Sequence, residues 1–479
     1  MNASTASRLP ARTGTPAALI LLITTIVIVF LFGGGARDDI RSLVFLRPIT
    51  AMLFVAAVIG SLPGAWREHR VVVGLALAWT GLIVVHLIPL PPALWSSLPG
   101  RGVIADIYAG LRMPLPWLPL SIAPETTWNA AFAMMAPLAG LLFALTLRRD
   151  RLYVVLRVLL IIGFISGLVG LLQAINPERS GLYFYRITND RSAVGLFANR
   201  NHQAVLLACM FPLLSAHLSL MTGRPEKLLL YKRLTLVAVG LLVPLVLVTG
   251  SRAGLVLGVV GLALALAVYR TPVPTGRVVK GQRMSGTHTV IAGVGVAIIA
   301  VVVIATSRAS SVQRLMGDDV VGDLRTQVAP LLWNAMWTYF PFGSGIGSFV
   351  ETYALIEPDR LLTSNYVNHA HNDVLELLLT GGVPALVLMI AAAVLYVVAA
   401  KKLVLPADRS VVGTPANILG KLGLTLILLL FAGSLADYPL RTPSLAVFAM
   451  VAVAFVAVGL RELAPTGGSG HSNGQSYGR

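Results

Sequence analysis

The chain has 479 residues, of which 56% are hydrophobic and only 12% are charged. Soluble globular domains carry about 25% charged residues, so this composition excludes a soluble protein. The single cysteine, Cys209, excludes a framework of structural disulfides.

Apolar stretches long enough to cross a bilayer recur along the whole chain. A membrane-spanning helix needs about 17–25 mainly apolar residues, and lipid leaves no partner for backbone polar groups outside helices or closed barrels. We therefore predict an all-α, polytopic helical membrane protein with about twelve transmembrane helices. In chain order these are 17–32, 43–62, 71–90, 127–147, 152–174, 204–220, 234–248, 253–269, 289–306, 374–400, 419–435 and 444–460.

The distribution of charge orients these predicted spans. Arg8 and Arg12 precede the first span as in a signal peptide, but further spans follow, so we expect an uncleaved signal anchor. With the N-terminus inside, the loops on that side contain the whole net charge of +17, because basic and acidic residues balance on the other side. The positive-inside rule then places both termini in the cytoplasm. The basicity orients the chain and does not indicate nucleic-acid binding.

The opposite face, which we expect to be periplasmic, has arginine as its only basic residue, because every lysine falls in a cytoplasmic segment. The planar guanidinium binds phosphate through two hydrogen bonds, which the ammonium of lysine does not do. This bias favours an anionic ligand at the outer face. The alternative is that arginine is simply common in this chain.

We expect an N-terminal transmembrane bundle with outer loops, a core with a large periplasmic loop, C-terminal transmembrane helices and a disordered tail. The large loop contains interfacial helices, one of them the amphipathic segment 324–340. The four parts are residues 1–233, residues 234–398 with the loop at 307–372, residues 399–464 and residues 465–479.

Polar clusters occur at the outer ends of several predicted spans. Residues 191–202 place Arg191 and Arg200 just before a span, and the alternative is an interfacial loop that only caps the next helix. Arg252 follows a tight turn between two spans, where a charge is costly unless it is paired, functional or snorkelling to the headgroups.

The large outer loop adds an arginine and a glycine-rich segment. Arg325 precedes the amphipathic segment, and glycines alternate in the following stretch PFGSGIGSF at 341–349. No strand precedes this stretch and no Lys-Ser/Thr pair follows, so a nucleotide-binding P-loop is disfavoured. The glycines and serines more simply let the backbone approach other helices or a glycan.

The stretch 365–382 contains the main candidate for catalysis. His371, Asn372, Asp373 and Glu376 lie where a span begins, and such groups at a membrane edge are costly unless used or paired. Gly381, Gly382 and Pro384 interrupt the apolar pattern, so we expect a short helix before the true span starts at residue 383.

The alternative for His371 is a structural histidine, and His369 is the less favoured of the two. Arg441, in the last outer turn at 437–441, adds another cation. The spacing of the two histidines with Asp373 matches no zinc motif, so we predict no metal site.

These residues together resemble the superfamily of O-antigen ligases and O-antigen polymerases. The resemblance rests on the SRAG turn at 251–254, on Trp333 with PFGSGIGSF, and on HNDVLEL at 371–377 running on to Gly381-Gly382. It covers roughly residues 234–398, and GLFANRNHQA at 195–204 adds to it.

The resemblance implies a metal-independent, cofactor-free glycosyltransferase of the bacterial inner membrane. Such enzymes move a glycan from undecaprenyl pyrophosphate to an acceptor hydroxyl, on the lipid A core or on a growing glycan, at the periplasmic face. Arg252 would bind the pyrophosphate, with Arg191, Arg325 and Arg200 as further candidates, and His371 would act as base or orient the acceptor. We expect Asn372, Asp373, Glu376 and Arg441 to support the site.

We favour an O-antigen ligase over an O-antigen or exopolysaccharide polymerase, although no residue decides among them. The acceptor, the sugars, their stereochemistry and the oligomeric state are not predicted. A transporter of an anionic lipid or metabolite is a more distant alternative with the same twelve-span layout. It would be expected to show two related halves and polar groups near mid-membrane, whereas the clusters here lie at span ends.

Overall fold

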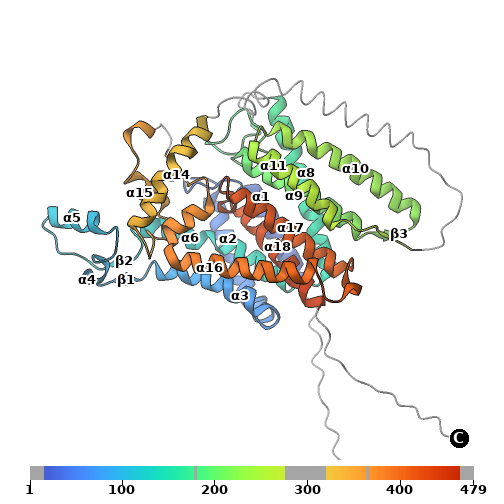
Figure 1. Cartoon of the computed structure of the whole chain (residues 1–479), viewed down its shortest axis with the longest axis horizontal. Helices are drawn as coiled ribbons and strands as arrows, with labels where there is room; N and C mark the ends of the chain where they lie inside the picture. The colour runs from blue at the N-terminus through green and yellow to red at the C-terminus, as the bar shows by residue number, and fades with distance from the viewer. Residues whose placement is uncertain (1–15, 177–180, 276–319, 363–365, 464–479) are drawn as a thin grey trace, which may run out of the picture.

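The structure is a computed structural model that describes residues 16–176, 181–275, 320–362 and 366–463 (Figure 1). The described part is mostly helical, as predicted, with almost no strand. Its two sheets are pairs of two-residue strands. β1 (Pro89–Leu90) pairs antiparallel with β2 (Leu118–Pro119), and β3 (Thr222–Gly223) pairs parallel with β4 (Val273–Pro274).

The described helices follow one another along the chain. They are α1 (Pro16–Phe32), α2 (Leu43–Gly60), α3 (Leu62–Val85), α4 (Pro92–Trp95), α5 (Gly102–Gly110), α6 (Pro124–Ala133), α7 (Met135–Leu145), α8 (Arg149–Ile175), α9 (Arg200–Ser219), α10 (Pro225–Val248), α11 (Arg252–Val268), α14 (Val320–Thr338), α15 (Phe349–Ala354), α16 (Asp373–Val404), α17 (Pro415–Ser434) and α18 (Pro443–Leu463). Three short 3₁₀ turns are η1 (Asp359–Leu361), η2 (Arg409–Val411) and η3 (Pro439–Arg441).

The predicted spans coincide with these helices. Within the described residues, nine helices are long and apolar enough to cross a membrane, and α1 and α11 are shorter apolar helices. The predicted span 289–306 lies outside the described residues, so the expected number of spans stays a prediction. The fold is that of a multi-pass, all-α membrane protein.

Two helix boundaries differ from the sequence prediction. α10 begins at Pro225, nine residues before the predicted span at 234, because the helix continues beyond the apolar segment. α3 begins at Leu62, directly after α2, so the predicted loop before residue 71 is helical. The helix bends there at His69, whose backbone is non-helical.

α9 is the centre of the bundle. In its apolar window 94% of the residues are buried, and it packs against α8, α10, α11 and α17. Small residues allow the closest of these contacts. A Cβ added to Gly254 of α11 would lie 2.3 Å from Ala204 Cβ, and one on Gly261 would lie 2.5 Å from the Ala208 carbonyl oxygen. The start of α11 is therefore held against the start of α9.

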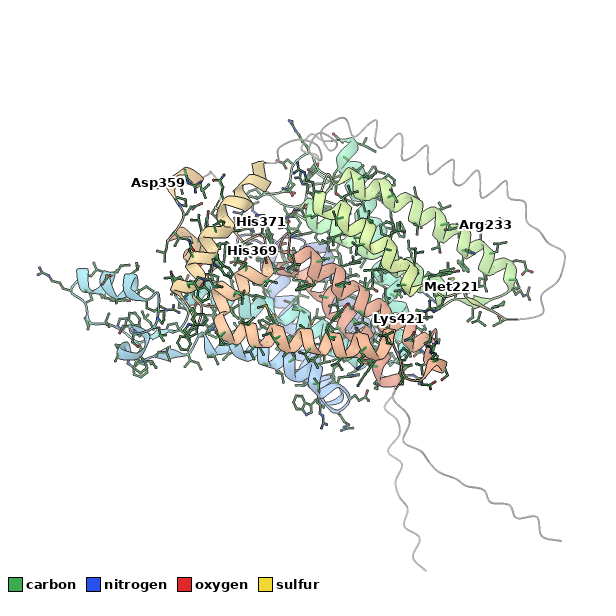
Figure 2. All side chains as sticks on the ribbon, viewed as in Figure 1. Met221, Arg233, Asp359, His369, His371 and Lys421 are labelled. Carbon is green, nitrogen blue, oxygen red and sulfur yellow. The ribbon has the colours of Figure 1, made fainter. Side chains whose placement is uncertain are left out.

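The segments around α14 and α15 lie at one end of the bundle, and α4, α5 and the β1–β2 pair extend beyond it (Figure 1). His369 and His371 lie next to each other where this end meets the bundle (Figure 2). Lys421 and Arg233 are well separated from the two histidines in the same view.

Candidate functional site

Three helices begin at the site, each capped by a short polar side chain. Asn199 caps α9 by accepting from the Asn201 amide at 2.8 Å, and Ser251 caps α11 by accepting from the Gly254 amide at 2.9 Å. Asn372 caps α16 by accepting from the next two free amides at 3.0 and 3.1 Å. Capping by Asn and Ser satisfies amides that lack a partner in the first helical turn. The positive ends of three helix dipoles are thereby directed at one region.

His371 contacts a buried carboxylate. Its Nδ1 lies 2.9 Å from Asp437 Oδ1, and the Asp437 side chain is 3% exposed whereas that of His371 is 23% exposed. When Nδ1 carries the proton and donates to the carboxylate, Nε2 of the neutral ring holds the lone pair. The contact therefore orients the imidazole and is compatible with the tautomer in which Nε2 is the basic nitrogen.

Asp437 joins His371 to the starts of α9 and α11. Its Oδ2 accepts from Asn199 Nδ2 at 3.0 Å and from the side-chain Nδ2 of Asn201. Asn201 Oδ1 in turn accepts from Ser251 Oγ at 2.7 Å. Arg252 follows Ser251 as the first residue of α11, so one hydrogen-bonded network connects His371 with the turn that carries Arg252.

The backbone of His371 is in the left-handed region, with φ of +51°. A non-glycine residue held there costs about 1–3 kcal/mol, and such strain is concentrated at functional sites. The neighbouring contact with Asp437 and the Asn372 cap hold the residue in this conformation. The strain favours a functional role for His371 over a purely structural one.

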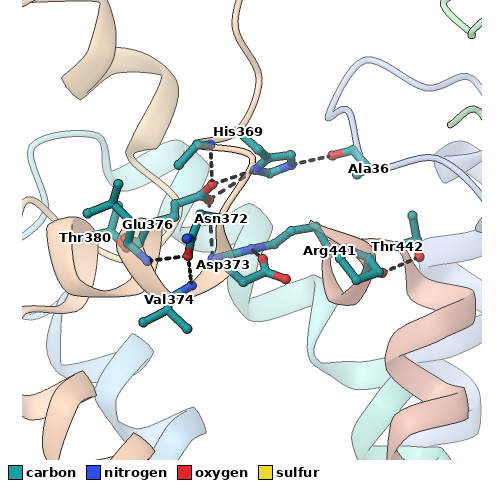
Figure 3. A network of polar contacts seen from close by, with 12 residues as sticks. Ala36, His369, Asn372, Asp373, Val374, Glu376, Thr380, Arg441 and Thr442 are labelled. Atoms are coloured by element: carbon teal, nitrogen blue, oxygen red, sulfur yellow. Dashed lines mark hydrogen bonds and ion pairs between the residues drawn. The ribbon is translucent and has the colours of Figure 1, made fainter. Parts of the chain in front are cut away.

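His369 has a different environment from His371 (Figure 3). Its Nδ1 lies 3.1 and 3.2 Å from the two Glu376 oxygens, and its Nε2 lies 3.2 Å from the Ala36 carbonyl oxygen. Burial alone would lower the pKa of His369, but the Glu376 carboxylate outweighs it and the pKa is raised. Both ring nitrogens of His369 thus contact protein groups.

Asp373, Glu376 and Arg441, predicted as supporting residues, form one buried ion-pair network with His369 (Figure 3). Arg441 Nε lies 3.0 Å from Asp373 Oδ1, and its Nη2 lies 3.3 Å from Glu376 Oε1. Glu376 also accepts from the Ala370 amide at 2.9 Å. This network ties the start of α16 to the turn η3, and so holds the backbone on either side of His371 and Asp437.

Tyr438 lies between three histidines. Its ring centroid is 4.6 Å from that of His369, 4.9 Å from that of His371 and 5.1 Å from that of His202. An aromatic ring packed against imidazoles restricts their rotation without adding a charge. Tyr438 thus sets the spacing between the ion-pair network and the His371–Asp437 pair.

The glycine-rich segment 341–349 braces the break in α16. Gly382 has a φ of +57°, which interrupts the helix at the predicted position. Pro341 accepts from the Val383 amide at 2.8 Å, and the amides of Ser344 and Gly345 donate to carbonyls just before the break at 3.1 and 2.8 Å. The loop thus supplies the hydrogen bonds that the break removes. Its glycines serve close backbone contact, as the sequence analysis favoured.

The predicted arginines are distributed unequally around the network. Arg252 is exposed at the first position of α11, and Arg200 is half-buried at the first position of α9. Arg191 is exposed in the loop before α9, with a φ of +58°. Arg325 belongs to α14, and its side chain is not among the side chains that the structure describes. Among the described residues, no group of three His, Cys, Asp or Glu side chains is placed to hold a metal ion.

Asp437, Tyr438, Asn199 and Asn201 were not predicted as site residues. From the turn 437–441, only Arg441 was expected to contribute to the site. A carboxylate at the outer end of a span has to be paired, so Asp437 carried a signal that a search for acids as well as arginines would have found.

A polar network at the ends of several spans in an all-helical bundle defines a multi-pass membrane protein with a site at one membrane face. Residues 236–390 match the family model described as O-antigen ligase. This match, which covers about a third of the chain, supports the predicted resemblance to the O-antigen ligase superfamily. The matched segment contains Arg252, Arg325 and His371, whereas Asp437 and Arg441 lie beyond it. No curated protein matches the chain significantly.

Proposed function

We propose that this protein is an O-antigen ligase that moves a glycan from undecaprenyl pyrophosphate to an acceptor hydroxyl at the periplasmic face of the inner membrane. The observation that carries the proposal is the His371–Asp437 contact, joined by hydrogen bonds to the turn before Arg252. A base and an arginine-bearing helix start are the two features that glycosyl transfer from a pyrophosphate carrier requires.

In the proposed reaction the acceptor hydroxyl oxygen attacks the anomeric carbon of the first sugar. The bond between that carbon and the pyrophosphate oxygen breaks, and its electron pair leaves with the carrier pyrophosphate. The hydroxyl proton passes to Nε2 of His371, which Asp437 keeps in the required tautomer and stabilises once charged. General-base assistance of this kind is worth about 10²–10⁴-fold in rate.

Negative charge accumulates on the pyrophosphate as the bond breaks. We propose that Arg252 binds this group, with Arg200, Arg191 and Arg325 as further contacts. Guanidinium groups offer paired N–H donors to phosphate, and the N-termini of α9 and α11 add the positive ends of their dipoles. Donors arranged before the reaction stabilise the developing charge without reorganising. No metal ion is invoked in this scheme.

An O-antigen or exopolysaccharide polymerase would use the same donor chemistry with a growing glycan as acceptor. Deleting the gene and separating the lipopolysaccharide by electrophoresis beside a complemented strain distinguishes these activities. A ligase predicts loss of long chains from lipid A with accumulation of carrier-linked polymer. A single repeat unit on lipid A would instead show a polymerase, and loss of capsule or secreted glycan alone would show exopolysaccharide assembly. Absence of any glycan phenotype would contradict the proposal and favour the transporter.

A further inference from the structure

Arg37 and Arg441 line two cavities beside the ion-pair network described above. Arg37 comes from the loop between α1 and α2, and both cavities are bordered by Arg37, Asp38, Asn129, Ala133 and Arg441. Their volumes are about 50 and 100 Å³. A single water needs about 10–15 Å³ by this measure, so the space admits a group larger than water.

Arg37 is half-buried, and its guanidinium is not fully hydrogen-bonded. Its side chain is 13% exposed, and its Nε and Nη2 are buried atoms without a hydrogen-bond partner. The guanidinium carbon lies 4.0 Å above the ring centre of Tyr366, and the Asp39 carboxylate is 3.7 Å from Nε, beyond hydrogen-bond distance. Arg441 Nη2 also has no hydrogen bond, but it is ion-paired with Glu376 Oε1 at 3.3 Å, so Arg37 carries the main unsatisfied donors. Buried guanidinium N–H groups are normally satisfied, so this cavity is suited to an oxyanion that accepts from them.

The cavity bordered by α2 and α6 has a positive balance of charge. Arg37, Arg47 and Arg441 line it against the single carboxylate of Asp38. In the other cavity Glu376 and Asp38 offset Arg37 and Arg441. The lining at the α2 side thus has the larger excess of arginines over carboxylates, although Arg441 is also paired with Asp373 and Glu376 outside it.

The same cavity has an apolar wall that continues along the helices. Leu43 and Leu46 of α2, Phe132 and Ala133 of α6, and Ala136 of α7 form it. Phe132 is 42% exposed, and the neighbouring Val44 and Phe45 of α2 are 72% and 64% exposed, as expected for side chains that face lipid. The cavity thus has an arginine-lined end and an apolar wall that faces the membrane. This combination fits a molecule with an anionic head and a hydrocarbon chain, whereas a free anion would contact only the arginine-lined end.

We propose that the cavity between α2 and α6 binds the phosphate group of a lipid whose chain lies along Phe132 and Ala133. The site is separate from the pyrophosphate contacts assigned to Arg252. Binding of the lipid requires no transfer reaction and so does not depend on the proposed function. Only the expectation that the bound lipid is a substrate rests on the proposed function.

Binding of farnesyl pyrophosphate to the full chain in phosphatidylcholine nanodiscs tests the proposal, with inorganic pyrophosphate and farnesol as probes of head and chain alone. The measurements are made in an Arg252→Gln background, so that the proposed catalytic site does not contribute. Arg37→Gln is expected to raise the Kd for farnesyl pyrophosphate about tenfold or more, as loss of charge-assisted hydrogen bonds does. Arg41→Gln, which removes an exposed charge from the same loop, should change it less than about twofold.

Two further variants separate the head from the chain. Ala133→Trp narrows the apolar wall, and we expect it to weaken farnesyl pyrophosphate binding while leaving inorganic pyrophosphate unchanged. Arg37→Lys keeps the charge and is expected to give a Kd between those of the wild type and Arg37→Gln. This variant shows whether the effect of Arg37→Gln comes from lost binding contacts or from misfolding. Equal changes in Kd for Arg37→Gln and Arg41→Gln would contradict a binding site at Arg37. An unchanged Kd of the Ala133→Trp variant for farnesyl pyrophosphate would contradict binding of a lipid chain. The cavity would then be a site for free phosphate. A defect in glycan transfer with normal binding would concern the proposed function alone.

Discussion

His371 and Asp437 are 66 positions apart in the chain, and their side chains meet at 2.9 Å. The contact joins the start of α16 to the turn after α17 and orients the imidazole. Because Asp437 also accepts from Asn199 and Asn201, its carboxylate is held in place by the start of α9. The pair has the arrangement of a base and its positioning residue, with the base the more exposed of the two.

We predict that His371→Ala lowers glycan transfer in a reconstituted assay about 10²–10⁴-fold, the range of general-base assistance. Asp437→Asn keeps the shape but offers an amide in place of the carboxylate, so it should also lower the rate and should alter its pH profile. His217→Ala, near the other end of α9, is the matched control and should keep wild-type activity. Wild-type transfer by the His371 variant would remove it from the mechanism.

Arg252→Lys keeps the positive charge at the start of α11 and loses the planar pair of donors. If Arg252 binds pyrophosphate through that pair, the rate of transfer at subsaturating donor should fall about tenfold or more. Arg233→Lys, on α10 away from the histidines, serves as the control (Figure 2). Full activity of Arg252→Lys, with normal expression, would reduce Arg252 to a determinant of membrane orientation.

The helical spans were predictable because lipid imposes a strong and local requirement on the sequence. About 17–25 apolar residues have to follow one another, and the described helices match the predicted stretches. The start of α10 was not predictable in this way, since backbone hydrogen bonding continues past the apolar segment through Lys227 and Lys232.

The sequence allowed single candidate residues of the site to be selected, but not the contacts between them. Arg252, His371 and Glu376 could be selected because polar groups at span ends are costly without a role. The partner of His371 could not be assigned, since nothing in a single sequence relates Asp437 to Asn199, 238 positions earlier. The division of roles between the two histidines likewise depends on tertiary contacts that place Glu376 beside His369.

The His369–Glu376 pair predicts a pH dependence of stability. The folded-state pKa of His369 is raised above its usual value of 6.5, so the stability it contributes is present below that value and is lost as the pH rises through the folded pKa. His86 acts in the opposite sense at lower pH, because burial lowers its pKa to about 4. We therefore expect the melting temperature of the detergent-solubilised protein to fall as the pH is raised above 6.5. His369→Gln should flatten this part of the profile, and an unchanged profile in the variant would refute the assignment.

Gly382 is predicted to be required for the break in α16. Its φ is +57°, and a Cβ there would lie 2.2 Å from the carbonyl oxygen of Pro341. Gly382→Ala should destabilise the protein by about 1–3 kcal/mol or more, through strain and displacement of the bracing loop. Gly81→Ala in α3 is the matched control, since no atom lies within 4 Å of its added Cβ and alanine favours a helix. Thermal unfolding of both variants measures the difference. Because the residues before the break carry Asp373 and Glu376, Gly382→Ala should also lower transfer activity, whereas Gly81→Ala should not.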